Sequence, residues 1–167
     1  MESVRTARAA DLPRCVELVA AARDEATTVR GGALLAALGD QTTGTPRTDG
    51  SGDRTDPARV VESWVAGGPT RILLIGIFEG ATVGLATGHV VERGTRRIGR
   101  VDCCYVEAGA RQVGVGGLLV EGLLEWFVTR QCSDVDAIAL PGDRETKQLL
   151  ETAGFKARLL VLHRPLG

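Results

Sequence analysis

Residues 106–126 read VEAGARQVGVGGLLVEGLLEW, a stretch in which glycines separate a strand-like run from a helix-like run. Arg111, Gly114, Gly116 and Gly117 lie at the changeover. Glycine lets the backbone approach a ligand, and the free N–H groups of a helix N-terminus attract phosphate oxygens. Arginine adds a permanent cation with planar donors. The stretch therefore predicts a phosphate site, while close packing of the strand on the helix would also explain its glycines.

Two common nucleotide-binding motifs do not fit this stretch. A Walker loop ends in Lys-Ser or Lys-Thr, and neither pair follows the glycines. A Rossmann fingerprint needs G-x-G-x-x-G near the start of a parallel β-α-β unit, and these glycines lack that spacing. The sequence therefore argues against nucleoside triphosphates and NAD as ligands.

The flanking sequence predicts an alternation of strands and helices. Runs of β-forming residues precede the stretch, and helical and strand-like patterns alternate after it. The predicted strands cover residues 4–7, 71–79, 82–91, 97–106, 135–140 and 155–163, and the predicted helices begin near residues 11, 31, 56, 114 and 145. Asp56 is the expected N-cap of the third helix, with Pro57 in its first turn.

This order of elements predicts the fold class α+β. Antiparallel strands followed by a β-α-β crossover give a mixed, mostly antiparallel sheet with helices on both faces. A chain of 167 residues with 44% apolar residues fits one domain over residues 1–167. Residues 39–55 contain Gly, Thr, Ser, Asp and Pro with almost no apolar side chain, so we expect a flexible loop there.

Three motifs in this order resemble the GNAT superfamily of N-acetyltransferases. RQVGVG at residues 111–116 is similar to its R/Q-x-x-G-x-G/A signature, and ETAGF at 151–155 is similar to its E-x-x-G-F ending. The residues that end at Val106 resemble its fourth strand. The resemblance spans nearly the whole chain. It implies direct transfer of an acetyl group from acetyl-CoA to a primary amine of a small molecule or a protein. A non-catalytic sensor or assembly domain that binds acyl-CoA is the alternative.

The resemblance also implies where acetyl-CoA binds. Its pyrophosphate is expected on the turn formed by Arg111, Gln112, Val113, Gly114, Val115, Gly116 and Gly117. Its pantetheine arm is expected along the backbone of Cys104, Tyr105 and Val106, between splayed fourth and fifth strands. Asp143 stands where the family usually has Asn, a change that keeps a helix N-cap but loses an amide donor.

The resemblance leaves the catalytic groups less well defined. The family's best-known carboxylate base lies at the position of Arg100 here. Two-residue alternation places Asp102 on the same face as Arg100, Cys104 and Val106, with Tyr105 on the opposite face. Asp102 is therefore the candidate base, acting through water, although an ion pair with Arg97 or Arg100 would make it purely structural. The family's tyrosine acid is replaced by Leu150, which offers no proton.

Composition argues against several other classes of protein. The chain has 20 Lys and Arg against 21 Asp and Glu, and 4% aromatic residues, so nucleic acid is not an expected partner. The N-terminus lacks the apolar run of a secretory signal, and no stretch approaches the roughly 20 apolar residues of a membrane span. We therefore expect a cytoplasmic protein with no membrane partner.

The four cysteines form no C-x-x-C and the chain has two histidines, so no metal is expected. His89 and His163 receive no catalytic role, because an isolated histidine is usually structural. The sequence leaves a homodimer open and does not name the acceptor.

Overall fold

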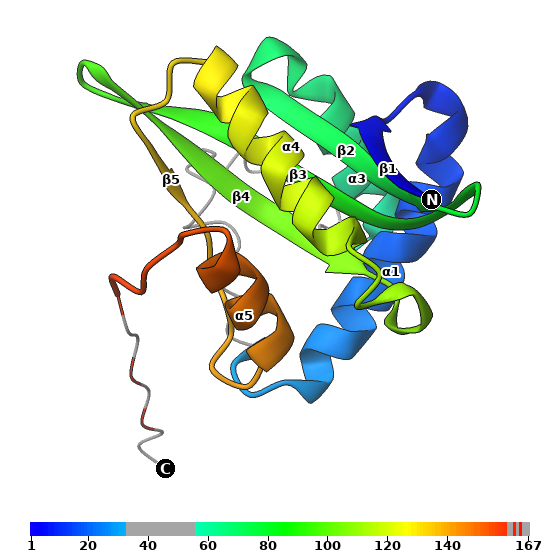
Figure 1. Cartoon of the computed structure of the whole chain (residues 1–167). Helices are drawn as coiled ribbons and strands as arrows, with labels where there is room; N and C mark the ends of the chain where they lie inside the picture. The colour runs from blue at the N-terminus through cyan, green and yellow to red at the C-terminus, as the bar shows by residue number, and fades with distance from the viewer. Residues whose placement is uncertain (33–55, 160–161, 163, 165–167) are drawn as a thin grey trace.

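The computed structural model describes residues 1–32, 56–159, 162 and 164, and its centre is a five-stranded sheet. The strands lie in the order β1 to β5 (Figure 1). The first four are antiparallel neighbours, and β4 and β5 are parallel. Their bounds are β1 Glu2–Thr6, β2 Arg71–Phe78, β3 Ala81–Arg93, β4 Arg96–Val106 and β5 Asp134–Asp136.

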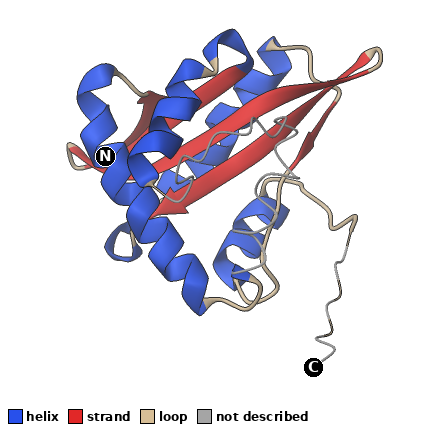
Figure 2. Ribbon diagram, turned by 180° about the vertical axis from the view of Figure 1, so that it is seen from behind, coloured by secondary structure: helices blue, strands red, loops and turns tan. Residues whose placement is uncertain are grey.

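Helices cover both faces of this sheet, as Figures 1 and 2 show from opposite sides. Helices α1 (Leu12–Thr28) and α3 (Pro57–Ala66) lie on one face, and α4 (Val115–Thr129) lies on the other. Helix α5 (Arg144–Thr152) follows β5 and packs beside α4. Three short 3₁₀ turns complete the described elements: η1 Ala9–Asp11, η2 Gly68–Thr70 and η3 Ala108–Ala110. The predicted fold class, a mixed and mostly antiparallel sheet with helices on both faces, is confirmed.

Local sequence explains why several of these elements begin and end where they do. Glu79 and Gly80 have φ angles of 50° and 84°, which suit a two-residue turn between antiparallel strands. The Asp56 side chain accepts a hydrogen bond from the Ala58 N–H at 3.0 Å, so the predicted N-cap is confirmed. Asp11 stands at the N-cap position of α1, but its carboxylate instead binds Arg5 and the Arg8 N–H.

Two apolar clusters form the core, one on each face of the sheet. Alternate residues of β2 divide between them, because successive side chains of a strand point to opposite faces. Leu73 and Ile75 pack towards α1 and α3, whereas Leu74 packs towards α4. A Cβ atom on Gly99 would lie 2.6 Å from the Phe127 ring, so glycine at that position allows α4 to approach the sheet closely.

The C-terminal third departs from the predicted elements. Strand β5 has only three residues, and residues 137–140 form no strand. The predicted last strand at 155–163 is also wrong for the part that is described, because residues 155–159 and 162 have no strand structure. A strand needs a hydrogen-bonded neighbour, and β5 ends too early to supply one. Leu159 is accordingly 86% exposed, and this segment runs away from the sheet (Figure 1).

Two sequence expectations lie outside the described residues. The flexible loop at 39–55 and most of the weak helix at 31–38 fall in the range 33–55. Among the helices that are described, none combines the length and the apolar composition that a bilayer span requires.

Candidate functional site

The two edges of β4 differ in their pairing. One edge pairs with β3 from Arg96 to Val106, but the other pairs with β5 only from Ile98 to Arg100. Within the described residues, the β4 backbone beyond Arg100 has no strand beside it on the β5 side (Figure 1). We call this stretch, residues 101–106, the open edge of β4. It leaves backbone N–H and C=O groups available to a ligand that lies along the strand.

The segment at residues 111–117, here called the glycine turn, leads from β4 into α4. Gln112 and Gly114 have φ angles of 65° and 92°, and Gly114 is the N-cap residue. The first backbone bond of the helix runs from the Leu118 N–H to the Gly114 oxygen at 3.2 Å. In the described part of the chain, the N–H groups of Val115, Gly116 and Gly117 have no backbone acceptor. They form the positive end of the α4 dipole.

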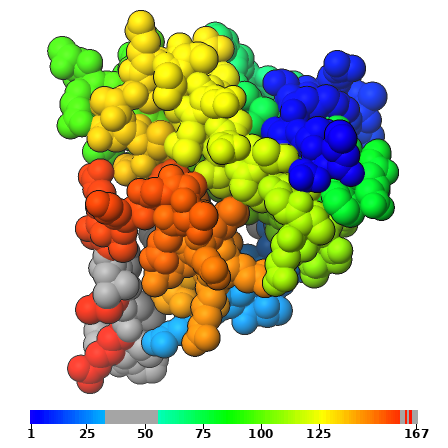
Figure 3. All heavy atoms as spheres, viewed as in Figure 1, coloured from blue at the N-terminus to red at the C-terminus, as the bar shows by residue number. Residues whose placement is uncertain are grey.

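Three residues at the start of α4 have different reasons for their identity. The Val115 side chain is buried against the sheet, so only its backbone faces outward. A Cβ atom on Gly116 would lie 3.3 Å from Leu149, so this glycine serves the contact between α4 and α5. In the space-filling view, the orange atoms of α5 lie against the yellow-green and yellow atoms of α4 (Figure 3). A Cβ atom on Gly117 would meet no atom within 4 Å. Packing therefore does not explain Gly117, whose N–H is one of the free donors at the positive end of α4.

Arg111 links the glycine turn to three other parts of the molecule. Its Nη2 lies 2.6 Å from Glu25 of α1, and its Nη1 lies 3.0 Å from Glu145 of α5. Its Nε donates to the Val106 oxygen at 2.9 Å. The hydrogen bonds to Glu25 raise the pKa of Arg111 above its usual value. A pyrophosphate bound to this guanidinium would have to compete with both carboxylates.

Asp102 lies at an irregularity in the pairing of β3 and β4. Thr87 pairs with Cys103 and Gly88 pairs with Val101, so Asp102 is an extra residue in β4. Such a bulge changes the direction in which side chains point. Cys104 and Val106 consequently pack towards α4, while Cys103 and Tyr105 pack towards α1 and α3.

The bulge overturns the predicted alternation. Asp102 does not share a face with Cys104 and Val106, because its carboxylate contacts Arg71 and His89. Arg71 and His89 lie at an even spacing along their strands from Leu73 and Leu85, which face α1 and α3. Tyr105 lies on the same face as Asp102 rather than on the opposite one. The prediction failed because strict alternation assumes a strand without an inserted residue.

Arg71, His89 and Asp102 form a compact group, which we call the buried polar cluster. Arg71 Nη1 lies 2.6 Å from Asp102 Oδ2, and the side chains are 13% and 8% exposed. His89 Nδ1 lies 2.9 Å from the same carboxylate. The ion-pair partner is thus on β2, whereas the sequence suggested Arg97 or Arg100. A partner so distant in sequence has no local signal.

His89 carries the least expected feature of this cluster. A carboxylate that is paired with arginine can only accept, so the hydrogen of the imidazole lies on Nδ1. Its Nε2 is buried and has no hydrogen-bond partner in the described structure. An unsatisfied buried polar atom costs about 1–3 kcal/mol, so its retention calls for an explanation. The sequence analysis gave His89 no catalytic role, because its only signal was a titratable residue within an apolar strand.

The other sequence candidates have plainer surroundings. Burial raises the pKa values of Cys103 and Cys104 to about 12, so neither thiol is prepared to act as a nucleophile. Asp143 is the N-cap of α5, where its carboxylate accepts from the Thr146 N–H at 2.9 Å. Leu150 is buried in α5 and offers no proton. No group of three potential metal ligands occurs among the described side chains.

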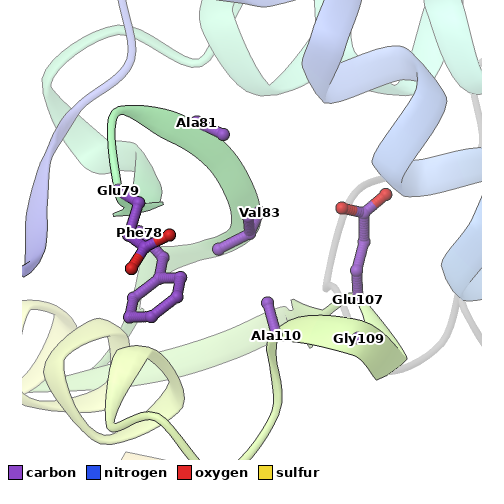
Figure 4. Close-up of a pocket in the computed structure, with 7 residues that line it drawn as sticks. All are labelled: Phe78, Glu79, Ala81, Val83, Glu107, Gly109 and Ala110. Atoms are coloured by element: carbon purple, nitrogen blue, oxygen red, sulfur yellow. The ribbon is translucent and has the colours of Figure 1, made fainter.

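A separate open hollow lies at the end of the sheet where β2 ends and β3 begins (Figure 4). It is bounded by the β2–β3 turn and by η3, and the Glu79 and Glu107 carboxylates line it. None of the residues predicted to bind acetyl-CoA lines this hollow. Because two carboxylates would repel a pyrophosphate, the open edge of β4 with the glycine turn is the better candidate site.

Comparisons with known proteins point to one family. The sequence model of the acetyltransferase (GNAT) family matches residues 36–155. A search of curated proteins finds no match.

Solved structures similar to this chain include three acetyltransferases. Glucosamine-6-phosphate N-acetyltransferase from Arabidopsis thaliana has a TM-score of 0.64 and 16% identity, covering 100% of this chain and 99% of its own. An acetyltransferase from Trypanosoma brucei gives 0.63 and 18%, with coverages of 99% and 100%. AAC(6')-Iy in complex with a bisubstrate CoA analogue gives 0.67 and 12%, with coverages of 99% and 98%. At these identities the likeness shows the fold.

Proposed function

The chain belongs to the acetyltransferase (GNAT) family, and we propose that it transfers the acetyl group of acetyl-CoA directly to a primary amine bound on the α1/α3 face. The observation that carries this proposal is the continuity between the open edge of β4 and the free N–H groups at the start of α4. Together they offer an extended backbone for the pantetheine arm and a positive end for the pyrophosphate.

The proposed binding of acetyl-CoA uses backbone more than side chains. The N–H groups of Val115, Gly116 and Gly117 receive the pyrophosphate, and the absence of a Cβ at Gly117 lets its oxygens come close. The backbone of Cys104, Tyr105 and Val106 receives the pantetheine arm. Arg111 reaches the pyrophosphate by exchanging Glu25 and Glu145 for phosphate oxygens, which is also a charge-assisted contact. When bound, acetyl-CoA supplies the thioester that the amine attacks.

The amine is proposed to approach on the other side of β4, above the bulge. Asp102 is proposed to take part in the removal of its proton. The bulge supports this role, since it turns Asp102 towards the face of α1 and α3 and away from α4. The ion pair with Arg71 fixes the position of the carboxylate.

Ligand binding is tested with a pair of glycine variants. Neither Gly109 nor Gly117 has a positive φ, and a Cβ on either would meet no atom within 4 Å. Gly117→Val should leave the melting temperature of the free protein nearly unchanged but remove the upward shift caused by acetyl-CoA. Gly109→Val, outside the glycine turn, should keep that shift. An equal shift in both variants would remove the pyrophosphate assignment.

Turnover is tested by the release of free CoA thiol in a panel of primary amines. An acetyltransferase releases one thiol for each acetylated amine, whereas a protein that only binds acyl-CoA shows the melting shift without release. Because Leu150 replaces the family's acid, and one positioned acid contributes about 10² to 10⁴ in rate, turnover should be slow but measurable.

A further inference from the structure

We infer that His89 Nε2 is the atom that takes the proton from the acceptor amine, and that Asp102 is its positioning carboxylate. This inference rests on the proposed acetyl transfer and assigns the base within it. Asp102 is already engaged by Arg71 at 2.6 Å and by His89 at 2.9 Å. The only nitrogen of the cluster that can accept a proton and has no partner in the described structure is His89 Nε2.

The contacts of His89 orient its Nε2 as a proton acceptor. The hydrogen bond from Nδ1 to Asp102 fixes both the tautomer and the ring orientation, so the lone pair is on Nε2. His89 pairs with Arg71 of β2 and Arg100 of β4, which places it in the middle of the sheet on the α1/α3 face. Nine-tenths of its side chain is buried, which holds the ring in place.

The charges around His89 suit a neutral imidazole that becomes protonated during the reaction. Arg71 and Arg100 lie opposite it on the neighbouring strands, and Asp102 contacts it directly. On α1, Arg23 is the charge that acts on neighbouring Cys103. The cluster of Arg71, Asp102 and neutral His89 has no net charge, and it gains one positive charge as the acceptor ammonium loses one. The total charge of the site is therefore unchanged.

The chemical step balances as follows. One N–H proton of the acceptor ammonium passes to His89 Nε2, which frees the nitrogen lone pair. That lone pair forms the C–N bond with the thioester carbon, the C–S bond breaks, and the thiolate leaves with the electron pair. A second N–H proton goes to the thiolate. His89 then releases its proton to water, and Asp102 stays ionised throughout.

The direct test is His89→Asn, whose side-chain amide can still donate to Asp102 but has no second nitrogen. With acetyl-CoA and the most active alkyl amine of the panel, kcat should fall about 10² to 10⁴-fold while KM for acetyl-CoA stays within about twofold. With an aromatic amine, which is already neutral at pH 7, the kcat of the variant should fall much less. Equal activity of His89→Asn and wild type on the alkyl amine overturns the inference and leaves acetyl transfer intact.

Asp102→Asn tests the positioning role. Without the carboxylate to orient the ring, kcat for the alkyl amine should fall while KM for acetyl-CoA stays within about twofold, and activity on the aromatic amine should fall much less. An equal loss of activity on both amines means that Asp102 is only structural, and this result contradicts its positioning role.

The ¹⁵N signals of His89, which can be measured without turnover, test this inference separately from the proposed function. The chain has two histidines, so the ¹⁵N signals of His89 are identified by their loss in His89→Asn. In the neutral imidazole they should show hydrogen on Nδ1 and none on Nε2. A neutral ring with its hydrogen on Nε2 overturns the inference whether or not any amine is acetylated. Absence of acetylation across the panel, with the predicted tautomer present, instead contradicts acetyl transfer.

Discussion

The two faces of the sheet differ in the kinds of side chain that they bury. The α4 face is apolar and closely packed, with Leu119, Leu123 and Phe127 buried against β2 to β4. The α1/α3 face has an apolar cluster too, but it also buries Arg71, His89 and Asp102 beside it. A structural face needs only complementary shape, whereas buried charges with an unpartnered nitrogen are expected where a protein does chemistry. This difference is consistent with our proposal that the cofactor binds at the start of α4 and that proton transfer takes place on the α1/α3 face.

The largest expected effect on stability is at the packed face. Phe127→Ala should lower the free energy of unfolding by about 3–5 kcal/mol, because it leaves a cavity between α4 and the sheet. Urea unfolding of the variant and wild type measures this. A loss below 1 kcal/mol would show that the α4 face is not the tightly packed one.

Breaking the buried ion pair should cost slightly less. Arg71→Met leaves Asp102 without its arginine and should destabilise the protein by about 3 kcal/mol. The double variant Arg71→Met with Asp102→Leu should recover most of this loss, because no charge remains unpaired, yet it should have no acetyltransferase activity. A stable and active double variant would refute a chemical role for the cluster.

A smaller effect is expected from crowding the packed face. Gly99→Ala places a Cβ atom against the Phe127 ring, where the available distance is 2.6 Å, and should cost about 1–3 kcal/mol. Gly109→Ala, with no atom within 4 Å of its added Cβ, is the matched control and should stay near wild type. Equal stability of the two variants would mean that α4 moves away from the sheet at little cost.

The smallest effect is the pH dependence that the partly buried thiols of Cys103 and Cys104 give to stability. The pKa values of Cys103 and Cys104 are about 12 in the folded protein against an ordinary value of 9.0. Their contribution to stability is fully present below pH 9 and is lost as the pH rises from about 9 towards 12, because only the unfolded state ionises there. A thiol reagent at pH 8 should modify both cysteines more slowly in the native protein than in the unfolded chain. Equally fast modification of the native and unfolded protein would contradict the raised pKa values.

How much the sequence could predict also differs between the two faces. The apolar periodicity of 115–127 and the glycines before it predicted α4 and the turn, since both signals are local. The buried polar cluster joins β2, β3 and β4 across a bulge, and no spacing in the sequence indicates that β4 contains an inserted residue. The expected alternation therefore put Asp102 and Tyr105 on opposite faces and passed over His89.

The same reasoning explains the errors after α4. Apolar runs at 135–140 and 155–163 have strand composition, but a strand also requires a neighbour with a free edge. Pairing of β5 with β4 ends at Asp136, and the described residues of these two runs beyond that point form no strand. Where the chain leaves β4, the open edge appears. The short pairing between β4 and β5 therefore explains why the strand prediction was wrong, and it also leaves the open edge on which the proposed site depends.

The most direct measurement is mass-spectrometric detection of an acetylated amine together with free CoA, for wild type, Gly117→Val and Gly109→Val. The account predicts equal amounts of acetylated amine and CoA with wild type and Gly109→Val, and neither with Gly117→Val. Acetylation by Gly117→Val at the wild-type rate would contradict the site, and no acetylated amine from any variant while acetyl-CoA still raises the melting temperature would contradict the activity.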